Sequence, residues 1–418
     1  MRWSSTRGAV SVDVCVIGAG PAGLAVAAAL SRKGISSLVL ERGPAVGWSW
    51  RNRYDRLHLH TTRRLSSLPG LVIPRRFGRF VARADVVRYL ARYAQVHQLD
   101  IATGTDVIDV GRLSPSTTDR SRWIVSAADG RQVAARTVVV ATGYSNVPLL
   151  PDWQGSGEFT GQIVHAHGYR NAAPYQGKSV LVVGGGNTGT EIAVDLAEGG
   201  AASVFLSMRS VPHIIRRNFG PWAAQMTGIL VRHLPAAVVD RIAALQARFT
   251  VPDLTAFGLP YPAPDLYTRV KRDKSVPVQD VGIIEAIQRR AVAPVVGIAH
   301  LTSNEVVLTD GTRLRPDVVL AATGYRTGLP TLMNSSIVEN EPTLFTTKGE
   351  PSARGGVESL PGLYFLGYTV SIGGTLRDIA LESRRIARAE AKEREAQLVD
   401  DRPHRPRVDG AVRTSPSG

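Results

Sequence analysis

Two glycine-rich segments carry the clearest chemistry in this chain. Gly18–Gly23 reads Gly-Ala-Gly-Pro-Ala-Gly, and Gly184–Gly189 reads Gly-Gly-Gly-Asn-Thr-Gly. Each follows a strand-like apolar run and precedes a helix-like segment, so the glycines can provide a tight turn, close approach of a pyrophosphate and close helix packing. A glycine turn without a ligand is the alternative, and the strand–loop–helix context disfavours it. We therefore predict two dinucleotide sites, whose simplest shared chemistry is electron transfer from one dinucleotide to the other.

The residues after the neighbouring strands predict which dinucleotide each loop binds. The predicted strand 37–40 ends in Glu41, and an acid about twenty residues beyond such a loop bonds the ribose hydroxyls of an adenosine. Glu41 would repel a 2′-phosphate, which favours FAD. After the predicted strand 203–206 no acid follows, and Arg209 and Ser210 suit the 2′-phosphate of NADPH. The alternative for Arg209 is a solvated surface arginine.

A third motif lies between the two loops. It reads Phe159-x-Gly161-x-x-x-His165-x-x-x-Tyr169. Together with the loops it resembles the fingerprint of class B flavin-dependent monooxygenases, the group that contains flavin-containing monooxygenases and the plant indole-3-pyruvate monooxygenases called YUCCA. Baeyer–Villiger monooxygenases have a related fingerprint that usually ends in Trp, whereas this one ends in Tyr169 followed by Arg170. The resemblance therefore favours the flavin-containing or YUCCA branch.

Further segments extend the resemblance over about residues 10–390. Tyr54–His60 and Val180–Leu196 are similar to YUCCA sequences, and the tripeptide Ala-Thr-Gly occurs at 141–143 and again at 322–324. The flavin-ring asparagine of flavin-containing monooxygenases is missing from the comparable stretch. YUCCA enzymes also lack it, so this departure does not argue against activity.

The strand–helix alternation and the resemblance predict an α/β fold. It contains two doubly wound, Rossmann-like dinucleotide-binding domains, with the NADPH domain inserted into the FAD domain. We place the first part of the FAD domain at 10–166, the NADPH domain at 167–329, the return segment of the FAD domain at 330–392 and a disordered tail at 393–418. A proline-rich helical excursion without sheet-like alternation is expected at 212–274.

The resemblance implies a reaction in which the cofactors carry the chemistry. NADPH reduces FAD, the reduced flavin reacts with O2 to form a C4a-(hydro)peroxyflavin, and one oxygen atom passes to a small organic substrate. Indole-3-pyruvate or a related α-keto acid is the first candidate substrate. N- or S-oxygenation of a soft nucleophile is the second candidate, and a Baeyer–Villiger reaction is the third. A flavoprotein reductase or oxidase that oxygenates no substrate, and a non-catalytic flavin-binding protein, are the alternatives from other classes.

The candidate site residues follow from these motifs. The fingerprint implies that His165 is a hinge that couples the position of NADP⁺ to the state of the flavin, and we expect His60 and Thr62 on the flavin face as further catalytic candidates. The alternatives are a histidine satisfied in a domain crossover and side chains used for packing. The candidate cofactor-binding residues are Gly18, Ala19, Gly20, Pro21, Ala22, Gly23, Glu41, Arg42, Trp48, Trp50, His60, Thr61, Val107, Ala141, Thr142, Gly143, Gly184, Gly186, Asn187, Thr188, Gly189, Arg209, Ser210, Ala322, Thr323, Gly324 and Tyr325.

Composition restricts the remaining classes of function. The formal net charge of +15 could attract anionic cofactors or an acidic substrate, but no nucleic-acid-binding module is recognised, so we expect no nucleic-acid partner. The single cysteine, Cys15, lies in the first predicted strand. It excludes a redox-active cysteine pair, as in thioredoxin reductase, and fits a reducing cytoplasm. No metal is expected.

The distribution of apolar residues bears on membrane association. No run of apolar residues is long enough to span a membrane, and no signal peptide is visible. Residues 222–245 have apolar residues at helical spacing, for which we expect two helices packed on the core. Contact with a membrane surface and a substrate tunnel are the alternatives for this segment. A monomer and a homo-oligomer are both compatible with the sequence.

Overall fold

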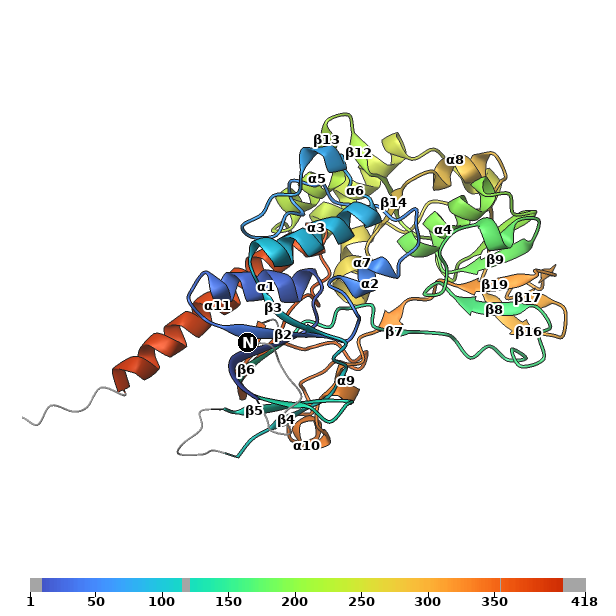
Figure 1. Ribbon diagram of the computed structural model, residues 1–418. Coiled ribbons are helices and arrows are strands. Elements are labelled where there is room, and N and C mark those ends of the chain that lie inside the picture. Colours follow the sequence, from blue (N-terminus) through green and yellow to red (C-terminus); the bar gives the residue numbers. More distant parts are fainter. Residues whose placement is uncertain (1–9, 115–120, 354, 401–418) are drawn as a thin grey trace, which may run out of the picture.

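The computed structural model describes residues 10–114, 121–353 and 355–400, and two lobes are built around two sheets (Figure 1). In the first sheet the strands β22, β6, β1, β2 and β3 are parallel, and β21, β4 and β5 are antiparallel additions. The strands are β1 (Val10–Ile17), β2 (Ser37–Glu41), β3 (Asp100–Thr103), β4 (Val107–Arg112), β5 (Trp123–Ala127), β6 (Gln132–Val140), β21 (Gly355–Val357) and β22 (Leu360–Phe365).

The first sheet is buried on both faces, which explains the continuous apolar run in β1. Val14 and Val16 pack under the helices on one face, and Cys15 and Ile17 pack against β4, β5 and two short helices on the other. The helices of the first face are α1 (Pro21–Ser31), α3 (Arg83–Val96) and α11 (Thr375–Asp400), and those of the second face are α9 (Leu329–Leu332) and α10 (Ser335–Asn340).

The second sheet is wholly parallel, in the order β15-β10-β9-β19-β8. Helices α4 and α8 cover one face and a small antiparallel sheet covers the other. The elements are β8 (Gln162–His165), β9 (Ser179–Val183), α4 (Asn187–Glu198), β10 (Ser203–Ser207), α8 (Ile283–Gln288), β15 (Ala293–Val295), β16 (Ile298–Leu301), β17 (Val306–Leu308), β18 (Arg313–Leu314) and β19 (Val318–Ala321).

The second lobe is an insertion into the first. The chain leaves through β7 (Val147–Pro148) and returns through β20 (Tyr325–Arg326), and these two crossings pair with each other as antiparallel strands. The predicted α/β fold with one nucleotide domain inserted into the other is thereby confirmed. The predicted boundary at residue 166 differs from the structure, because β8 pairs with β19 and is the edge strand of the second sheet.

The excursion from the second domain contains helices but also short strands, which the sequence pattern did not predict. Strand β11 pairs with β14 and β12 pairs with β13, so this segment has local sheet structure. Its elements are β11 (Ile214–Arg216), β12 (Asn218–Phe219), β13 (Trp222–Ala223), α5 (Ala224–Val231), α6 (Ala236–Thr250), α7 (Leu266–Asp273) and β14 (Val278–Asp280). Among the described residues, no helix combines the length and the hydropathy that crossing a membrane requires.

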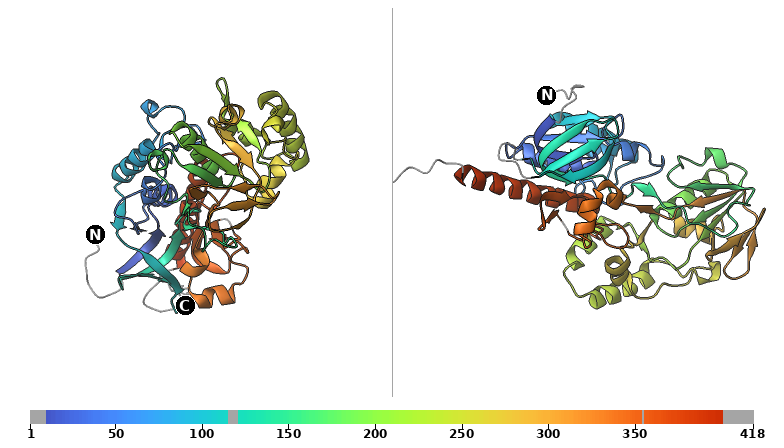
Figure 2. Two further views of the ribbon diagram at one scale, coloured as in Figure 1. Left: turned by 90° about the vertical axis from the view of Figure 1, so that its right-hand side faces the viewer. Right: turned by 90° about the horizontal axis from the view of Figure 1, so that it is seen from below.

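Helix α11 extends further than predicted and projects past the first lobe (Figure 2). Residues 393–400, which we expected to begin a disordered tail, are helical. The charged residues of this helix include Glu390, which is fully buried and accepts a hydrogen bond of 2.8 Å from Thr137 Oγ1. Arg136 lies 3.4 Å from the same carboxylate. The rest of the predicted tail, residues 401–418, lies outside the described residues.

Candidate active site

The first glycine loop has two glycines that pack and one that faces open space. Gly18 has φ of 105°, and a Cβ there would lie 2.6 Å from the carbonyl oxygen of Ala141. A Cβ at Gly23 would lie 1.8 Å from the carbonyl oxygen of Gly18. A Cβ at Gly20 would meet no atom within 4 Å. The loop therefore offers room at Gly20, directly at the start of α1, where a pyrophosphate would be held by helix N–H groups.

The second loop repeats this arrangement. A Cβ at Gly184, whose φ is 128°, would lie 2.4 Å from the carbonyl oxygen of Ala322, and one at Gly189 would lie 1.9 Å from that of Gly184. A Cβ at Gly186 would meet nothing within 4 Å. The two Ala-Thr-Gly motifs thus have a structural role, because the carbonyl group of each alanine packs against the first glycine of a loop and leaves no room for a side chain there.

The residue after the second strand differs between the two domains. Glu41 is 7% exposed, and its carboxylate accepts hydrogen bonds from the backbone N–H groups of Ala19 at 2.8 Å and Gly43 at 2.9 Å. The strand registers of both sheets put Met208 at the position equivalent to Glu41. The next residue, Arg209, is exposed and lies beside Gly297, while Met208 lies against Gly185 of the second loop. This geometry fits a ribose with free hydroxyls in the first domain and a 2′-phosphate in the second.

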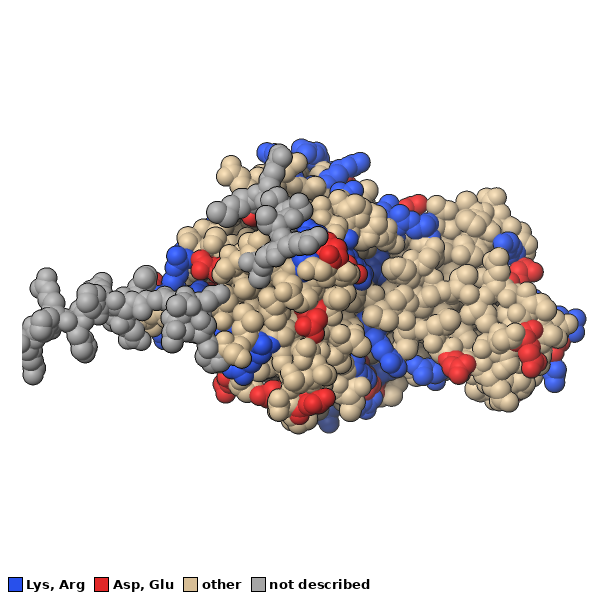
Figure 3. Space-filling view, turned by 60° about the horizontal axis from the view of Figure 1, so that its bottom comes forward, with Lys and Arg blue, Asp and Glu red and all other residues tan. Residues whose placement is uncertain are grey.

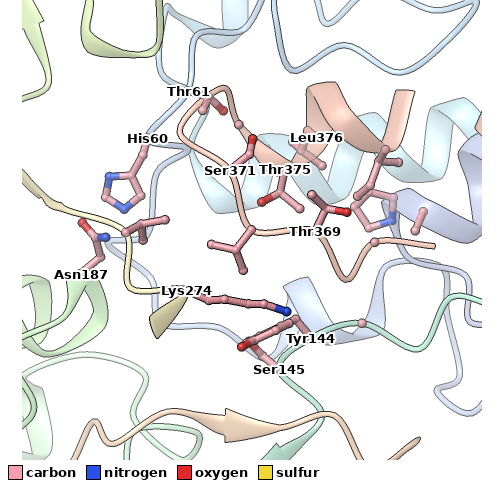
Figure 4. A pocket seen from close by; sticks show the side chains of 18 of the residues that line it. His60, Thr61, Tyr144, Ser145, Asn187, Lys274, Thr369, Ser371, Thr375 and Leu376 are labelled. Atoms are coloured by element: carbon pink, nitrogen blue, oxygen red, sulfur yellow. The ribbon is translucent and has the colours of Figure 1, made fainter. Parts of the chain in front are cut away.

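One cavity of about 960 Å³ connects the first loop with the start of α4 (Figure 4). The predicted site residues that line it are Gly18, Gly20, Pro21, Ala22, Glu41, Arg42, Trp48, Trp50, His60, Thr61, Val107, Ala141, Thr142, Gly143 and Asn187. The predicted site residues outside its lining are Ala19, Gly23, Thr62, His165, Gly184, Gly186, Thr188, Gly189, Arg209, Ser210, Ala322, Thr323, Gly324 and Tyr325.

The excursion supplies an apolar wall of this cavity, which agrees with the alternative of a substrate tunnel that the sequence left open for residues 222–245. Helices α5 and α6 place small and aliphatic side chains along it, including Val231, Val239 and Ala243. Thr62, which we expected on the flavin face, instead bonds the excursion, because its N–H donates to Gln225 Oε1 at 2.9 Å. The side-chain amide of Gln225 in turn donates to the carbonyl oxygen of Gly373 at 2.8 Å. The excursion is thus fastened to the first domain beside the cavity.

A second fastening joins Lys274, at the end of the excursion, to Glu350 of the return segment. Lys274 Nζ and the hydroxyl of Tyr144 both bond the Glu350 carboxylate, which is 3% exposed. Burial acts to raise the pKa of Glu350, but the bonds from Lys274 and Tyr144 outweigh it and the pKa lies below its ordinary value. Lys274 and Tyr144 lie together on the cavity wall in Figure 4.

His165 lies at the crossing between the domains, and its ring is satisfied on both nitrogens. Nδ1 accepts a hydrogen bond from the N–H of His167 at 3.0 Å, so Nε2 carries the proton and donates to the carbonyl oxygen of Gly324 at 3.0 Å. The ring also stands edge-on to Tyr325, with 5.1 Å between centroids. Burial lowers the pKa of His165 and favours the neutral ring. The histidine therefore connects β8 to the returning strand β20.

Comparison with known proteins agrees with this geometry. A family model described as pyridine nucleotide-disulphide oxidoreductase matches residues 15–219. Indole-3-pyruvate monooxygenase YUCCA1 of Oryza sativa subsp. japonica is 31% identical over 364 residues, which cover 85% of this chain and 86% of that protein. The chain belongs to the class B flavin-dependent monooxygenases.

Solved structures of flavin-dependent enzymes share the fold of this monooxygenase. A flavin-containing monooxygenase from Stenotrophomonas maltophilia is 26% identical and superposes with a TM-score of 0.68, covering 92% of this chain and 99% of that one. A bacillithiol disulfide reductase from Staphylococcus aureus, 16% identical, superposes with a TM-score of 0.63 over 94% of this chain and 100% of that one. This second likeness shows the fold alone, so the activity has to be argued from the family and the site.

Proposed function

We propose that the protein oxygenates a small, mostly apolar organic substrate with O2, drawing electrons from NADPH through FAD. The observation that carries the proposal is the single cavity that touches the first loop at Gly18 and Gly20, the second nucleotide helix at Asn187 and the apolar wall of α5 and α6. One space can therefore hold a flavin, receive a nicotinamide and admit a substrate. FAD at the first loop would accept a hydride from NADPH and activate O2 when bound.

In this proposal the residues of the chain bind and orient the two cofactors and enclose the reacting atoms. Glu41 and the open side of Gly20 would hold the adenosine and pyrophosphate of FAD, and Gly186 with Arg209 would hold NADPH. Basic side chains gather along the junction of the two lobes on the face shown in Figure 3, where they would attract both anionic dinucleotides. The α5–α6 wall would exclude water from the reacting atoms.

An indole-3-pyruvate-like α-keto acid is the proposed substrate, by likeness to the YUCCA relatives. A substrate carboxylate would bind best to a cation that is not already paired with an acidic side chain. Arg53 on the cavity wall meets this condition, because its hydrogen bonds go to neutral groups: the hydroxyl of Tyr325 at 2.7 Å and the carbonyl oxygen of Ser145 at 3.4 Å. Lys274, by contrast, is bonded to Glu350. N- or S-oxygenation is the second candidate, because an apolar wall accepts amines and thioethers equally well.

Transfer of electrons to a disulfide has no support in the chain. Cys15 is the single cysteine and is fully buried in β1, where burial raises the pKa of its thiol to about 12. A thiol in that state is a poor nucleophile and has no partner for a redox pair. The same cysteine supports the proposal of a reducing, cytoplasmic location.

Isotopically labelled O2 tests the proposed function. The protein is incubated with NADPH, the labelled gas and a panel of an indolic keto acid, a tertiary amine, a thioether and a cyclic ketone, and products are analysed by mass spectrometry. Label in the keto-acid product is the expected result. Turnover of the amine and thioether alone would exclude the keto acid, and absence of label from every product would favour a reductase or oxidase.

A further inference from the structure

The residues that follow β10 lie at the edge of the second sheet where the second glycine loop begins. Ser207, the last residue of β10, pairs with Val183, and its carbonyl oxygen accepts a hydrogen bond from the N–H of Gly184 at 2.9 Å. Arg209 and Ser210 come shortly after this contact, and both are exposed. If the pyrophosphate of a dinucleotide sits at the loop, the 2′ position of its adenosine ribose reaches this stretch.

A second arginine reaches the same stretch from the excursion. Arg269 lies on α7, and its guanidinium donates to the Ser210 hydroxyl at 3.0 Å and to the carbonyl oxygen of Val211 at 2.9 Å. Both partners are uncharged, and within the described part of the chain no ion pair joins Arg269 to an acid. Arg272 on the same helix is by contrast bonded to Asp273, at 2.9 Å and 2.8 Å. The charge of Arg269 is therefore available to a ligand, whereas that of Arg272 is compensated.

The acidic side chains near this arginine already have partners. Asp265, one helical turn before it, lies 3.0 Å from His213 Nε2. Asp240 of α6 is buried and accepts a hydrogen bond from the hydroxyl of Thr268 at 2.6 Å. Asp240 is also the single acidic residue between positions 199 and 252, so the stretch after β10 contains no acid of its own. Two arginines at an acid-free stretch favour a phosphate group as the ligand.

Helix α7 also reaches the large cavity. Leu266, its first residue, is part of the cavity lining. Tyr267 and Val270 of the same helix pack against Val239 of α6, which is another residue of the lining. Arg269 stands on this helix and bonds the stretch after β10. One short helix therefore connects that stretch to the apolar wall of the cavity.

We propose that Arg269 is a second cation, beside Arg209, for the 2′-phosphate of NADPH, and that this contact holds α7 and the adjoining cavity wall in place. Arginine has five N–H donors in a planar fork, and the bonds to Ser210 and Val211 use two of them, so donors remain for phosphate oxygens. The inference rests on the proposed function for the placement of NADPH at the second loop. NADH lacks the phosphate and would leave α7 without this contact.

The test uses two probes that differ by the 2′-phosphate alone. Adenosine 2′,5′-bisphosphate and adenosine 5′-monophosphate are titrated calorimetrically into the FAD-loaded protein, whose flavin absorbance shows that each variant is folded. Arg269→Gln should weaken binding of the bisphosphate at least about tenfold and leave binding of the monophosphate nearly unchanged. Arg269→Lys should recover part of the loss, because it keeps the charge without the planar fork. The control Arg272→Gln, on the same helix, should match the wild type.

Hydrogen exchange of backbone amides tests the connection to the cavity wall without turnover. The bisphosphate should slow exchange in α6 and α7 of the wild type but not of Arg269→Gln, and the monophosphate should slow it in neither protein. Unchanged exchange in the wild type, or undiminished bisphosphate binding by Arg269→Gln, would overturn the inference alone. Equal binding of both probes by the wild type would overturn it together with the placement of NADPH. Failure to oxygenate the substrate panel would count against the proposed function and leave these results standing.

Discussion

The two nucleotide loops are nearly the same in backbone design and differ in what surrounds them. In both, the first glycine packs on an Ala-Thr-Gly carbonyl and the third packs on the first, while Gly20 and Gly186 face open space. The first domain then has buried Glu41, and the second has Met208 followed by exposed Arg209. The first and third glycines therefore serve the fold, and we propose that the middle glycine and the end of the next strand serve the ligand.

The loops also differ in enclosure. Gly18 and Gly20 line the large cavity directly, whereas of the second loop and the start of α4 only Asn187 is part of the described lining. A dinucleotide at the first loop would be surrounded by both domains and the excursion. In our proposal, one at the second loop would reach from the exposed Arg209 toward the cavity. This difference supports a resident FAD and an exchangeable NADPH.

The largest effect is expected from filling the open side of each loop separately. Gly20 and Gly186 have φ of −82° and −86°, which any residue adopts, and a Cβ there meets no protein atom within 4 Å. Gly20→Val should therefore fold but lose FAD, and Gly186→Val should keep FAD but bind NADPH at least about tenfold more weakly. Flavin absorbance and NADPH titration measure the two outcomes.

The packing glycines provide the matched control for that pair. A side chain at Gly23 would collide with the carbonyl oxygen of Gly18, so Gly23→Val should fail to fold and not merely lose its ligand. Thermal unfolding followed by circular dichroism separates the two cases. A folded Gly20→Val protein with full FAD content would show that the first loop is wrongly assigned.

The strand-end residues should control which nicotinamide cofactor is used. Arg209→Ala should weaken the binding of NADPH by about 1–3 kcal/mol, the size of a charge-assisted phosphate contact, and leave the binding of NADH nearly unchanged. Met208→Glu, which copies the first domain, should shift the preference further toward NADH. Steady-state KM values for the two cofactors check both variants. If Arg209→Ala weakened the binding of NADPH and NADH equally, Arg209 would be a surface arginine without a role in binding the 2′-phosphate.

His165 should affect coupling between the domains more than cofactor content. Its ring joins β8 to Gly324 of the returning chain, so His165→Ala loosens the crossing without touching either loop. The variant should keep FAD and oxidise NADPH, with more hydrogen peroxide released per NADPH consumed. The ratio is measured by assaying the hydrogen peroxide formed and the NADPH consumed in the same reaction. A ratio equal to that of the wild type would mean that the histidine only packs between the domains.

The smallest expected effect is on stability in mild acid. Burial lowers the pKa of His165 and His167, so the unfolded chain binds protons more readily than the folded chain below about pH 6.5. Their contribution to stability is present above that pH and is lost as the pH falls. Urea unfolding at a series of pH values should show that the free energy of unfolding falls less steeply with decreasing pH in His165→Gln than in the wild type. An identical slope would mean that another group governs acid sensitivity.

The local motifs were predictable from sequence, and the contacts between distant segments were not. Glycine spacing and the acid at Glu41 are short-range signals: each glycine segment stands between a strand and a helix and Glu41 ends β2, while their binding roles stay predictions. The close approach of His60 to Glu191 and the ion pair of Lys274 with Glu350 join residues far apart in the chain, so no spacing rule reveals them. The charged end of α11 was predicted as a tail from residue 393 onward because its partners lie far away in the chain: Glu393 pairs with Arg122, and Gln397 accepts a hydrogen bond from Arg136.

Anaerobic reduction tests most directly the claim that electrons pass from the second loop to the first. Wild-type protein and Gly186→Val are mixed with NADPH without oxygen, and the yellow flavin absorbance is followed, with dithionite added afterwards as the control for a reducible flavin. NADPH should promptly bleach the wild type, whereas the Gly186→Val protein should stay yellow until dithionite is added. Bleaching of Gly186→Val by NADPH at the wild-type rate would contradict it.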